Sequence, residues 1–385
     1  MDYLLTDEQK TIKDLARRIA EEKILPIRAE LDETEEFPWE VIKELAAADM
    51  FRVFIPEEYE GLGGSCLDLC LVVEELSRIC GGIALSYAVS SLGTFALLVY
   101  GTEEQKQKYL PGIAAGTTLA AFAITEPSAG TDASAIKTTA EKVDGGYVIN
   151  GTKQFISSGG EAQLYTVIAM TNKAKGARGA SAILVEKDTP GFTFGKKEKK
   201  LGIRSSSTRE LIFKDCFVPD ENLIGKEGMG FIMVLKVFDH SRPGIGAQAL
   251  GIAQGALETA VEYARQRIQF GHPIIALPVL RYKLADMALQ IEAARALTYA
   301  TARMIDSGVK KFTEESAMSK VFASDMAMKV TTEAVQVLGG AGYMRDYPVE
   351  KMMRDAKITQ IYEGTNETLM ETIALELRKR KGRTD

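Results

Sequence analysis

The spacing of apolar residues changes twice along this chain, and that change constrains the fold more than any other feature. Up to about residue 118 apolar residues recur every three or four positions, as in helices that bury one face. Short β-type runs between turn residues follow, and the helical period then returns from about residue 226. The order predicts an α+β fold with an N-terminal α-helical domain (1–118), a small middle β-domain (119–225) and a C-terminal four-helix bundle (226–385).

Individual helices can be delimited within the two flanking regions. Thr6 and Gln9 have the spacing of a capping box, and Pro26 should end or bend the helix that follows. The predicted helical runs are 12–20, 39–49, 66–80, 84–99, 103–114, 246–267, 279–306, 313–338 and 366–379. Four long helices in succession at the C-terminal side are typical of an antiparallel bundle.

The middle region carries a strong hairpin signal. Asp144, Gly145 and Gly146 separate Val143 from the run 147–151, which favours a tight turn between two strands. Further strands are predicted at 164–170, 182–185 and 210–213. The lysines between Lys196 and Lys200 predict a solvated loop.

Composition narrows the functional classes. The chain of 385 residues has a net charge of −6 and no basic face is indicated, so nucleic acid is not an expected partner. Neither a signal peptide nor a transmembrane helix of about 18 uncharged apolar residues is expected, which makes the cytoplasm the default location.

The cysteines could belong to a metal site and the glycines to a dinucleotide-binding motif, but both patterns are better explained by packing. The four cysteines, with only His240 and His272 to assist them, are better interpreted as free buried thiols than as a metal site. Gly244, Gly246 and Gly251 lack the spacing and the preceding strand of a dinucleotide fingerprint. They predict close helix packing instead.

Four segments carry residue types suited to chemistry. Residues 122–131 (FAITEPSAGT) join a strand to polar groups and a glycine, which suits an aromatic heterocycle. In residues 361–366 (IYEGTN), Glu363 lies beside a glycine and before a helix start predicted at Thr365. Taken alone, such a residue is more often part of a solvated turn. The other two segments are 267–271 and 336–343.

Together these segments resemble the acyl-CoA dehydrogenase family, in its short- and medium-chain, butyryl-CoA dehydrogenase-like branch. The resemblance covers nearly the whole chain, in the family's order and spacing. It rests on FAITEPSAGTDAS (122–134), INGTKQFISSGG (149–160), LGIRSSSTRELIFKDCFVP (201–219), RQRIQFG (265–271), EAVQVLGGAGY (333–343) and MRDAKITQIYEGTNE (353–367).

The resemblance implies FAD as the cofactor and an acyl-CoA as the substrate. The implied FAD contacts are Phe122, Ile124, Thr125, Thr131, Phe155, Ile156, Ser157, Arg267, Gln269, Phe270, Gln336, Val337, Gly339, Gly340, Thr365 and Glu367. The implied substrate contacts are Thr131, Asp239, Arg242 and Gly364. The groups at 267–270 and 336–340 would reach FAD across a subunit interface, which implies a homotetramer.

Glu363 matches the family's catalytic base. Some relatives place the base at the position of Ser241, which cannot act as one. The implied reaction is α,β-dehydrogenation to the trans-2-enoyl-CoA: Glu363 takes the α-proton, flavin N5 takes the β-hydride, and electrons pass to electron-transfer flavoprotein. The alternatives are an acyl-CoA oxidase or an enoyl-CoA reductase on the same fold, or a non-catalytic helical scaffold.

Two further positions bear on the site. The family commonly has glutamine near Pro278 as a flavin or interface contact, and proline lacks both that side chain and an N–H. Tyr87 and Phe95 lie on the helix that should bound the acyl chain. An alternative of equal weight is that at least one of them is simply a core residue. If both point inward, they would shorten the pocket and favour short, branched or compact cyclic acyl groups.

Overall fold

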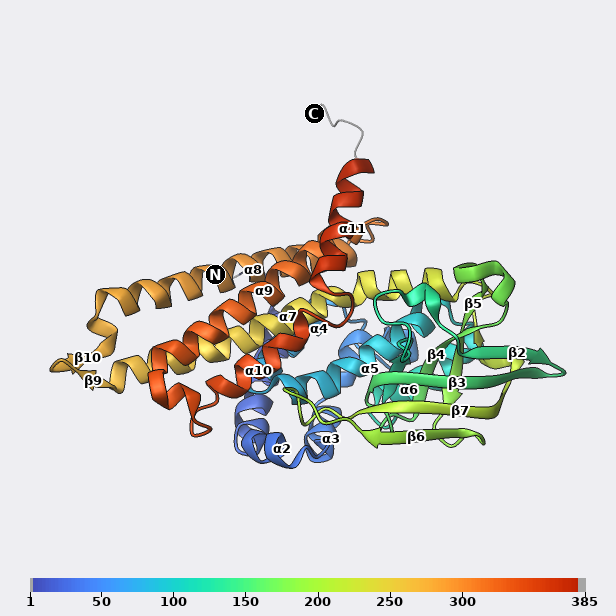
Figure 1. The fold of residues 1–385 in the computed structure, drawn as a ribbon, viewed down its shortest axis with the longest axis horizontal. Coiled ribbons are helices and arrows are strands. Elements are labelled where there is room, and N and C mark those ends of the chain that lie inside the picture. Colours follow the sequence, from blue (N-terminus) through green and yellow to red (C-terminus); the bar gives the residue numbers. More distant parts are fainter. Residues whose placement is uncertain (1–2, 380–385) are drawn as a thin grey trace.

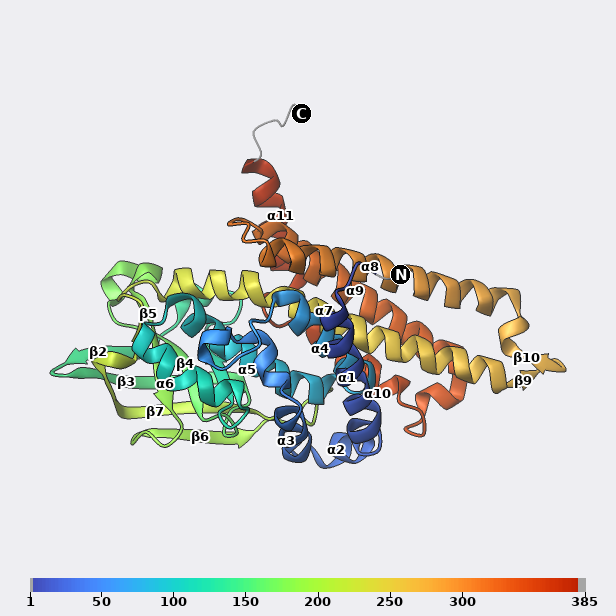
Figure 2. The ribbon, with the colours of Figure 1, turned by 180° about the vertical axis from the view of Figure 1, so that it is seen from behind.

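The structure, a computed structural model, describes residues 3–379. It places a sheet at one end of the molecule and long helices at the other, with the N-terminal helices against both (Figures 1 and 2). The N-terminal helices are α1 (Asp7–Ile19), α2 (Arg28–Thr34), α3 (Trp39–Ala47), α4 (Cys66–Ile79), α5 (Gly81–Tyr100) and α6 (Glu103–Ala114). The predicted helix, sheet, helix order is confirmed.

Side-chain caps fix where several of these helices begin. The predicted capping box of Thr6 and Gln9 is present, and Ser65 and Thr102 begin α4 and α6 in the same way. Each box satisfies backbone N–H groups that a helix start would otherwise leave unpaired. Helix α1 continues into a π-helical turn at Ala20–Ile24, just before Pro26.

Helix α5 corrects the expectation that no long apolar helix would be found. It has 20 residues and is long and apolar enough, by composition alone, to cross a membrane. Most of it is buried inside this protein, where it contacts α4, α7 and the first strand of the sheet. The hydroxyls of Ser86, Ser91 and Thr94 donate to carbonyls one turn back, as Thr94 does to Ser90 (2.6 Å), so they need no polar surroundings.

The sheet is mostly antiparallel and follows the predicted strands closely. Its strands are β1 (Ala120–Ala123), β2 (Thr139–Val143), β3 (Gly146–Ser157), β4 (Leu164–Met170), β5 (Ala180–Glu186), β6 (Phe192–Lys197), β7 (Thr208–Pro219) and β8 (Leu223–Ile224). The order is β6-β7-β3-β2-β4-β5-β8, and β1 pairs in parallel with β4. The predicted hairpin is β2–β3, in which Val143 lies opposite Gly146.

The predicted solvated loop at Lys196 to Lys200 is wrong in part. Strand β6 extends through Lys197, and Lys200 is half-buried with its Nζ donating to the carbonyl of Ser206 (2.7 Å). Burial lowers the pKa of Lys200 to about 8. The charge run therefore includes a side chain with a structural contact.

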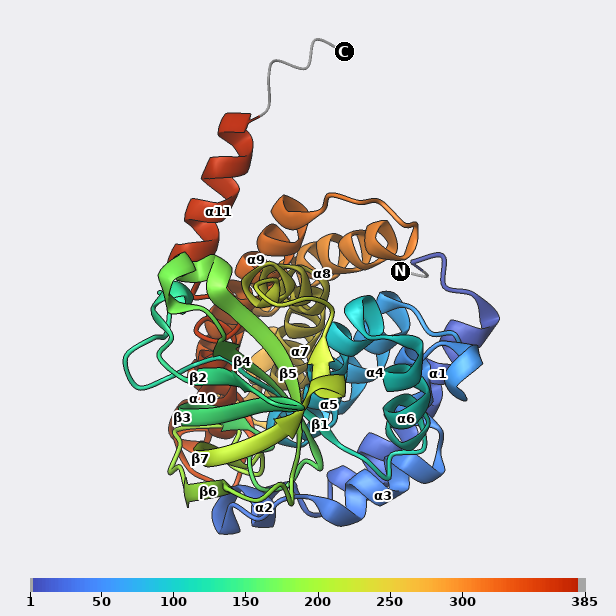
Figure 3. The same ribbon diagram turned by 90° about the vertical axis from the view of Figure 1, so that its right-hand side faces the viewer.

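The C-terminal helices are α7 (Gly230–Gln266), α8 (Pro278–Asp306), α9 (Thr313–Leu338), α10 (Val349–Thr359) and α11 (Asn366–Lys379). Helix α7 begins well before the start predicted at residue 246. Pro243 and Gly244 lie inside it, and because such residues usually interrupt helices, the pattern did not indicate the first part of the helix. Helix α10 was not predicted; it packs on α7 and α9 and completes the bundle. Helix α11 contacts α9 but projects away from the body (Figure 3).

Glycines set the closest contact between α4 and α7. A Cβ on Gly251 would lie 2.2 Å from the carbonyl oxygen of Glu74, and one on Gly255 would lie 2.0 Å from that of Arg78. The prediction of close packing is confirmed at Gly251. It is wrong at Gly244, where a Cβ would meet nothing within 4 Å.

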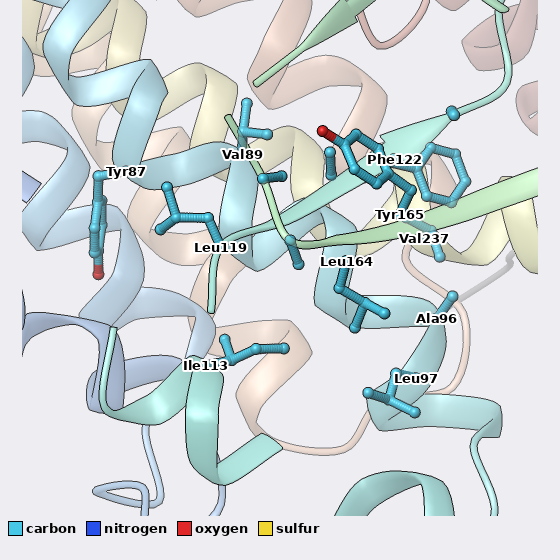
Figure 4. Close-up of a cluster of buried hydrophobic side chains, with 14 of the residues drawn as sticks. Tyr87, Val89, Ala96, Leu97, Ile113, Leu119, Phe122, Leu164, Tyr165 and Val237 are labelled. Atoms are coloured by element: carbon cyan, nitrogen blue, oxygen red, sulfur yellow. The ribbon is translucent and has the colours of Figure 1, made fainter. Parts of the chain in front are cut away.

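The core continues from the N-terminal helices into the sheet. Apolar side chains of α5, α6, β1, β4 and α7 meet in one cluster (Figure 4). Cys70, Cys80 and Cys216 are buried, Cys66 is partly exposed, and all four are free thiols, as predicted. Residues 3–379 contain no group of three or more His, Cys, Asp and Glu side chains that could hold a metal ion.

The glycine contacts predict opposite effects for two substitutions on one helix. Gly251→Ala should lower the free energy of unfolding by about 1–3 kcal/mol, because the new methyl group forces α4 and α7 apart. Gly244→Ala should leave stability unchanged or raise it by up to about 1 kcal/mol, because alanine favours helix and finds open space. Urea unfolding of both variants measures this difference, and equal destabilisation would contradict it.

Candidate active site

A cavity of about 130 Å³ lies where α4, α5 and α7 meet the ends of β1 and β3 and the turn before α11. It is lined by Leu69, Val73, Leu85, Ala88, Val89, Ser91, Leu92, Phe122, Ile124, Thr125, Phe155, Ile156, Ser157, Phe238, Ser241, Gly244, Ile245, Tyr362 and Glu363. The cavity thus brings together seven predicted site residues, Glu363 among them, from three distant parts of the sequence. Its remaining lining is largely aliphatic.

Glu363 presents its carboxylate to this cavity from a strained turn. Its φ of +53° lies in the left-handed region, which is uncommon for any residue other than glycine. Ser241 Oγ donates a short hydrogen bond to Oε2 of Glu363. Thus the side chain at the alternative base position contacts the predicted base directly.

Burial raises the pKa of Glu363 to about 7. The hydrogen bond from Ser241 and the positive charges of Arg242 and Lys320 act in the opposite direction and favour the carboxylate. A carboxyl group with a pKa near neutrality can accept a proton at physiological pH and is well suited to general-base catalysis.

Cations on two helices hold the backbone of the same turn. Arg242 Nε on α7 donates to the Glu363 carbonyl (3.2 Å), and Lys320 Nζ on α9 donates to the Gly364 carbonyl (2.7 Å). Gly364 has a φ of +98°, which glycine adopts without strain. Within residues 3–379 the N–H groups of Glu363 and Gly364 donate to no recorded acceptor, so they remain available to a ligand.

Asp239 and Arg242 lie behind this turn and do not line the cavity. Both are buried, and Arg242 Nη1 lies 2.9 Å from Asp239 Oδ1. Thr313 Oγ1 donates to the other Asp239 oxygen (2.6 Å). The pair therefore supports the turn that carries Glu363, and Arg242 is already committed to protein contacts.

A buried ion pair that the sequence did not single out organises the opposite wall. Lys153 Nζ lies 2.7 Å from Glu126 Oε1 and also donates to the carbonyl of Ile124 (3.0 Å). Glu126 accepts further hydrogen bonds from the backbone N–H groups of Lys137 and Thr138. The pair fixes the end of β1 against β3, where the lining residues Ile124 and Thr125 lie.

Phe155 reaches the cavity through an irregularity in β3. The pairing of β3 with β7 shifts register between Lys153 and Ile156, and Phe155 has a φ of +58°. Its side chain is 58% exposed although its neighbour Ile156 is buried. The bulge turns an aromatic ring out of the strand and towards the cavity.

Several predicted contacts lie outside the cavity. Thr131 and Glu367 are exposed, and Gly364 is not among the lining residues. Thr365 Oγ1 accepts from the N–H of Thr368 (3.3 Å), which confirms the predicted helix start.

A second group of predicted contacts lies at the far end of the bundle from the sheet (Figure 1). Arg267, Gln269 and Phe270 belong to the hairpin of β9 (Ile268–Gln269) and β10 (His272–Pro273), and Phe270 is 86% exposed. At the end of α9, Gln336, Gly339 and Gly340 are exposed and Val337 is buried. Pro278 is the first residue of α8, where its missing N–H has no cost.

Tyr87 and Phe95 do not line this cavity, so the interpretation in which both point inward and shorten it is wrong, and the alternative that at least one is a core residue is confirmed for Tyr87. Tyr87 is fully buried, donates to the carbonyl of Met50 (2.8 Å) and packs against Phe51. Phe95 lines a separate cavity of about 300 Å³ together with His240. From α5 it is Leu85, Ala88, Val89, Ser91 and Leu92 that line the cavity of Glu363.

Besides the pair of Lys153 and Glu126, two further contributors to the site were missed from the sequence. Lys320 lies three residues from Ala317 and from Ala323, on the buried face of α9, so a lysine on an apolar stripe was the available signal. Gly244 follows Ser241 by one turn of α7 and leaves open space in the cavity wall.

Comparison with known proteins identifies one family along nearly the whole chain. The N-terminal, middle and C-terminal domains of acyl-CoA dehydrogenase match residues 6–117, 121–216 and 228–377. A relative from Anaerotignum propionicum named acryloyl-CoA reductase (NADH) is 48% identical over 382 residues, which cover 99% of this chain and 97% of the relative.

Two solved structures superpose closely on this chain. Butyryl-CoA dehydrogenase from Megasphaera elsdenii has a TM-score of 0.96 and 47% identity, with 98% of this chain and 100% of that chain covered. A chain from a study of the electron transferring flavoprotein of Acidaminococcus fermentans has a TM-score of 0.96, 48% identity and the same coverage. With profile matches along almost its entire length and relatives of this similarity, the chain belongs to the acyl-CoA dehydrogenase family.

Proposed function

We propose that this protein catalyses the FAD-dependent α,β-dehydrogenation of an acyl-CoA thioester to the trans-2-enoyl-CoA, with Glu363 as the base that removes the α-proton. One observation carries the proposal. The Glu363 carboxylate, with its pKa raised to about 7, opens into the cavity that also exposes Phe122, Ile124, Phe155 and Ser157.

The residues present fit a flavin ring. Phe122, Ile124 and Phe155 offer apolar surface, and Thr125 and Ser157 offer polar groups beside it. When bound, FAD supplies the redox chemistry by accepting the β-hydrogen as hydride. The chain itself must then hold the substrate's α-carbon between this surface and the carboxylate of Glu363.

The turn around Glu363 supports the proton transfer in two ways. Its carboxylate is held by Ser241, so it is oriented before the substrate arrives. Removing an α-proton also builds negative charge on the thioester oxygen, which needs hydrogen-bond donors. The uncommitted N–H of Glu363 is the candidate donor from this chain. The aliphatic lining favours an uncharged acyl group.

Electron-transfer flavoprotein is the proposed electron acceptor. The support is the resemblance to the family, together with the closely similar chain from the study of the Acidaminococcus fermentans flavoprotein. The substrate and the acceptor together define the activity as an acyl-CoA dehydrogenase rather than an oxidase.

The proposed assembly is a homotetramer in which the hairpin of one subunit completes the FAD site of another. The support is that the β9–β10 hairpin, which follows Arg267, lies at the opposite end of the bundle from the sheet (Figure 1). Large apolar side chains are also exposed along α8, with Tyr282 80% and Leu289 66% accessible. Such surface is typical of a subunit interface.

Replacing the base tests the proposed reaction. Glu363→Gln should retain the fold and FAD but lose roughly 10²–10⁴-fold in turnover, because an amide cannot accept the α-proton. Visible absorbance reports FAD, and anaerobic bleaching by an acyl-CoA panel reports chemistry. The matched control is Glu371→Gln on exposed α11, which should behave as wild type. Wild-type bleaching by Glu363→Gln would remove Glu363 from the mechanism.

The pH dependence should report the ionisation of Glu363. The base acts unprotonated, so kcat/KM should rise with pH through about 7. Ser241→Ala removes a hydrogen bond that favours the carboxylate, so the step should move to higher pH. The residual activity of Glu363→Gln should lack the step; if that variant keeps it, another group is titrating.

The assembly can be tested at the hairpin. Arg267→Ala should lower both FAD content and the oligomer fraction, because it removes a cation proposed to contact phosphate across the interface. Arg265→Ala is the matched control, since Arg265 is also exposed but is not a proposed FAD contact. Sedimentation velocity measures assembly; a wild-type monomer that holds FAD would refute the proposal.

A further inference from the structure

Lys320 is a lysine with no exposed surface, buried beneath the turn that carries Glu363. Its Nζ donates to the Gly364 carbonyl (2.7 Å) and to Asn366 Oδ1 (2.9 Å). Within residues 3–379 it is in none of the recorded ion pairs. Burying an ammonium group without a carboxylate partner is costly, and a methionine of similar length would fill the space without that cost.

The contacts of Lys320 converge on the C-terminal side of Glu363, at Gly364 and Asn366. Asn366 also donates to Ser324 Oγ (2.9 Å) and to Asp325 Oδ1 (2.7 Å), so α9 grips the turn through several side chains. Glu363 has a positive φ, and such backbone at a residue other than glycine persists only when its surroundings hold it. Among these hydrogen bonds, the one to the Gly364 carbonyl is donated by Lys320.

The charge of Lys320 also acts on the carboxylate. The groups facing Glu363 are Ser241 and Arg242 on α7 and Lys320 on α9. Arg242 is itself paired with Asp239, which offsets part of its positive charge. Asp325 and Glu367, nearby on α9 and α11, add negative charge to the surroundings of Lys320. The pKa of Lys320 is lowered to about 8 by burial, with Glu363 opposing that shift, so the lysine is cationic at neutral pH.

We propose that Lys320 is a positioning residue for proton abstraction: it clamps the Gly364 carbonyl, and its cation stabilises the ionised form of Glu363. The inference rests on the proposed function of Glu363. It assigns a buried side chain on α9, which does not line the cavity, to the control of the base's geometry and ionisation.

Two variants separate the clamp from the charge. Lys320→Met removes both, so the limiting rate of flavin bleaching should fall about 10–100-fold, and its pH midpoint should rise. Lys320→Gln retains a donor without the charge, so it should raise the midpoint with a smaller loss of rate. Hydrogen–deuterium exchange of residues 359–369, read without substrate, should increase in Lys320→Met. The matched control is Lys329→Met, an exposed lysine of α9 paired with Asp286.

The outcomes are distinguishable. A wild-type pH midpoint in both Lys320 variants overturns the electrostatic part, and unchanged exchange in Lys320→Met overturns the clamp. If neither variant folds, Lys320 has a general structural role and the proposal is wrong. Failure of the proposed function is read separately, from wild-type bleaching by Glu363→Gln, and leaves the exchange result interpretable.

Discussion

The contact of α4 with α7 is the constraint on which the cavity depends. Gly251 and Gly255 let α7 approach the backbone carbonyls of Glu74 and Arg78, closer than any side chain would permit. That approach aligns the N-terminal half of α7 beside α4 and α5, so Ser241 and Gly244 face Leu69, Val73 and Ala88. The aliphatic pocket between these three helices therefore depends on the lack of side chains at Gly251 and Gly255.

Several buried charged side chains surround this pocket, in addition to buried ion pairs elsewhere such as Arg295–Glu74 and Lys351–Asp355. Lys153 and Glu126 support the sheet side, and Arg242, Asp239 and Lys320 support the turn of Glu363. Each cation also donates to a backbone carbonyl, so the charges hold main-chain segments that have no regular secondary structure. In a region of low dielectric these hydrogen bonds are strong and directional, which explains how irregular backbone is kept in one conformation.

The sequence was most informative where local chemistry decides the structure. The hairpin at Gly145, the capping box at Thr6 and strand β4 were predicted because turn and cap residues act within a few positions. The start of α7 was not, because packing overrides the local helix-breaking signals of Pro243 and Gly244. Helix α10 was also not predicted, and it packs on α7 and α9. The resemblance pointed to Glu363, but the role of Lys320 depends on contacts 44 residues away in sequence. Whether Tyr87 points inward or belongs to the core could not be decided from the sequence for the same reason, since its partner Met50 belongs to another segment.

The length of helix α7 has a consequence for mutations that inactivate the protein. About 26 residues separate Ser241 at the cavity from Arg267 at the hairpin, which at 1.5 Å per residue is roughly 40 Å. In the proposed assembly each chain therefore owns halves of two different active sites. Consider a dimer of one chain altered at Glu363 and one chain altered at Arg267. One of its two active sites would contain both substitutions, and the other site would contain neither. Two inactive alleles could then restore activity to one another when expressed together.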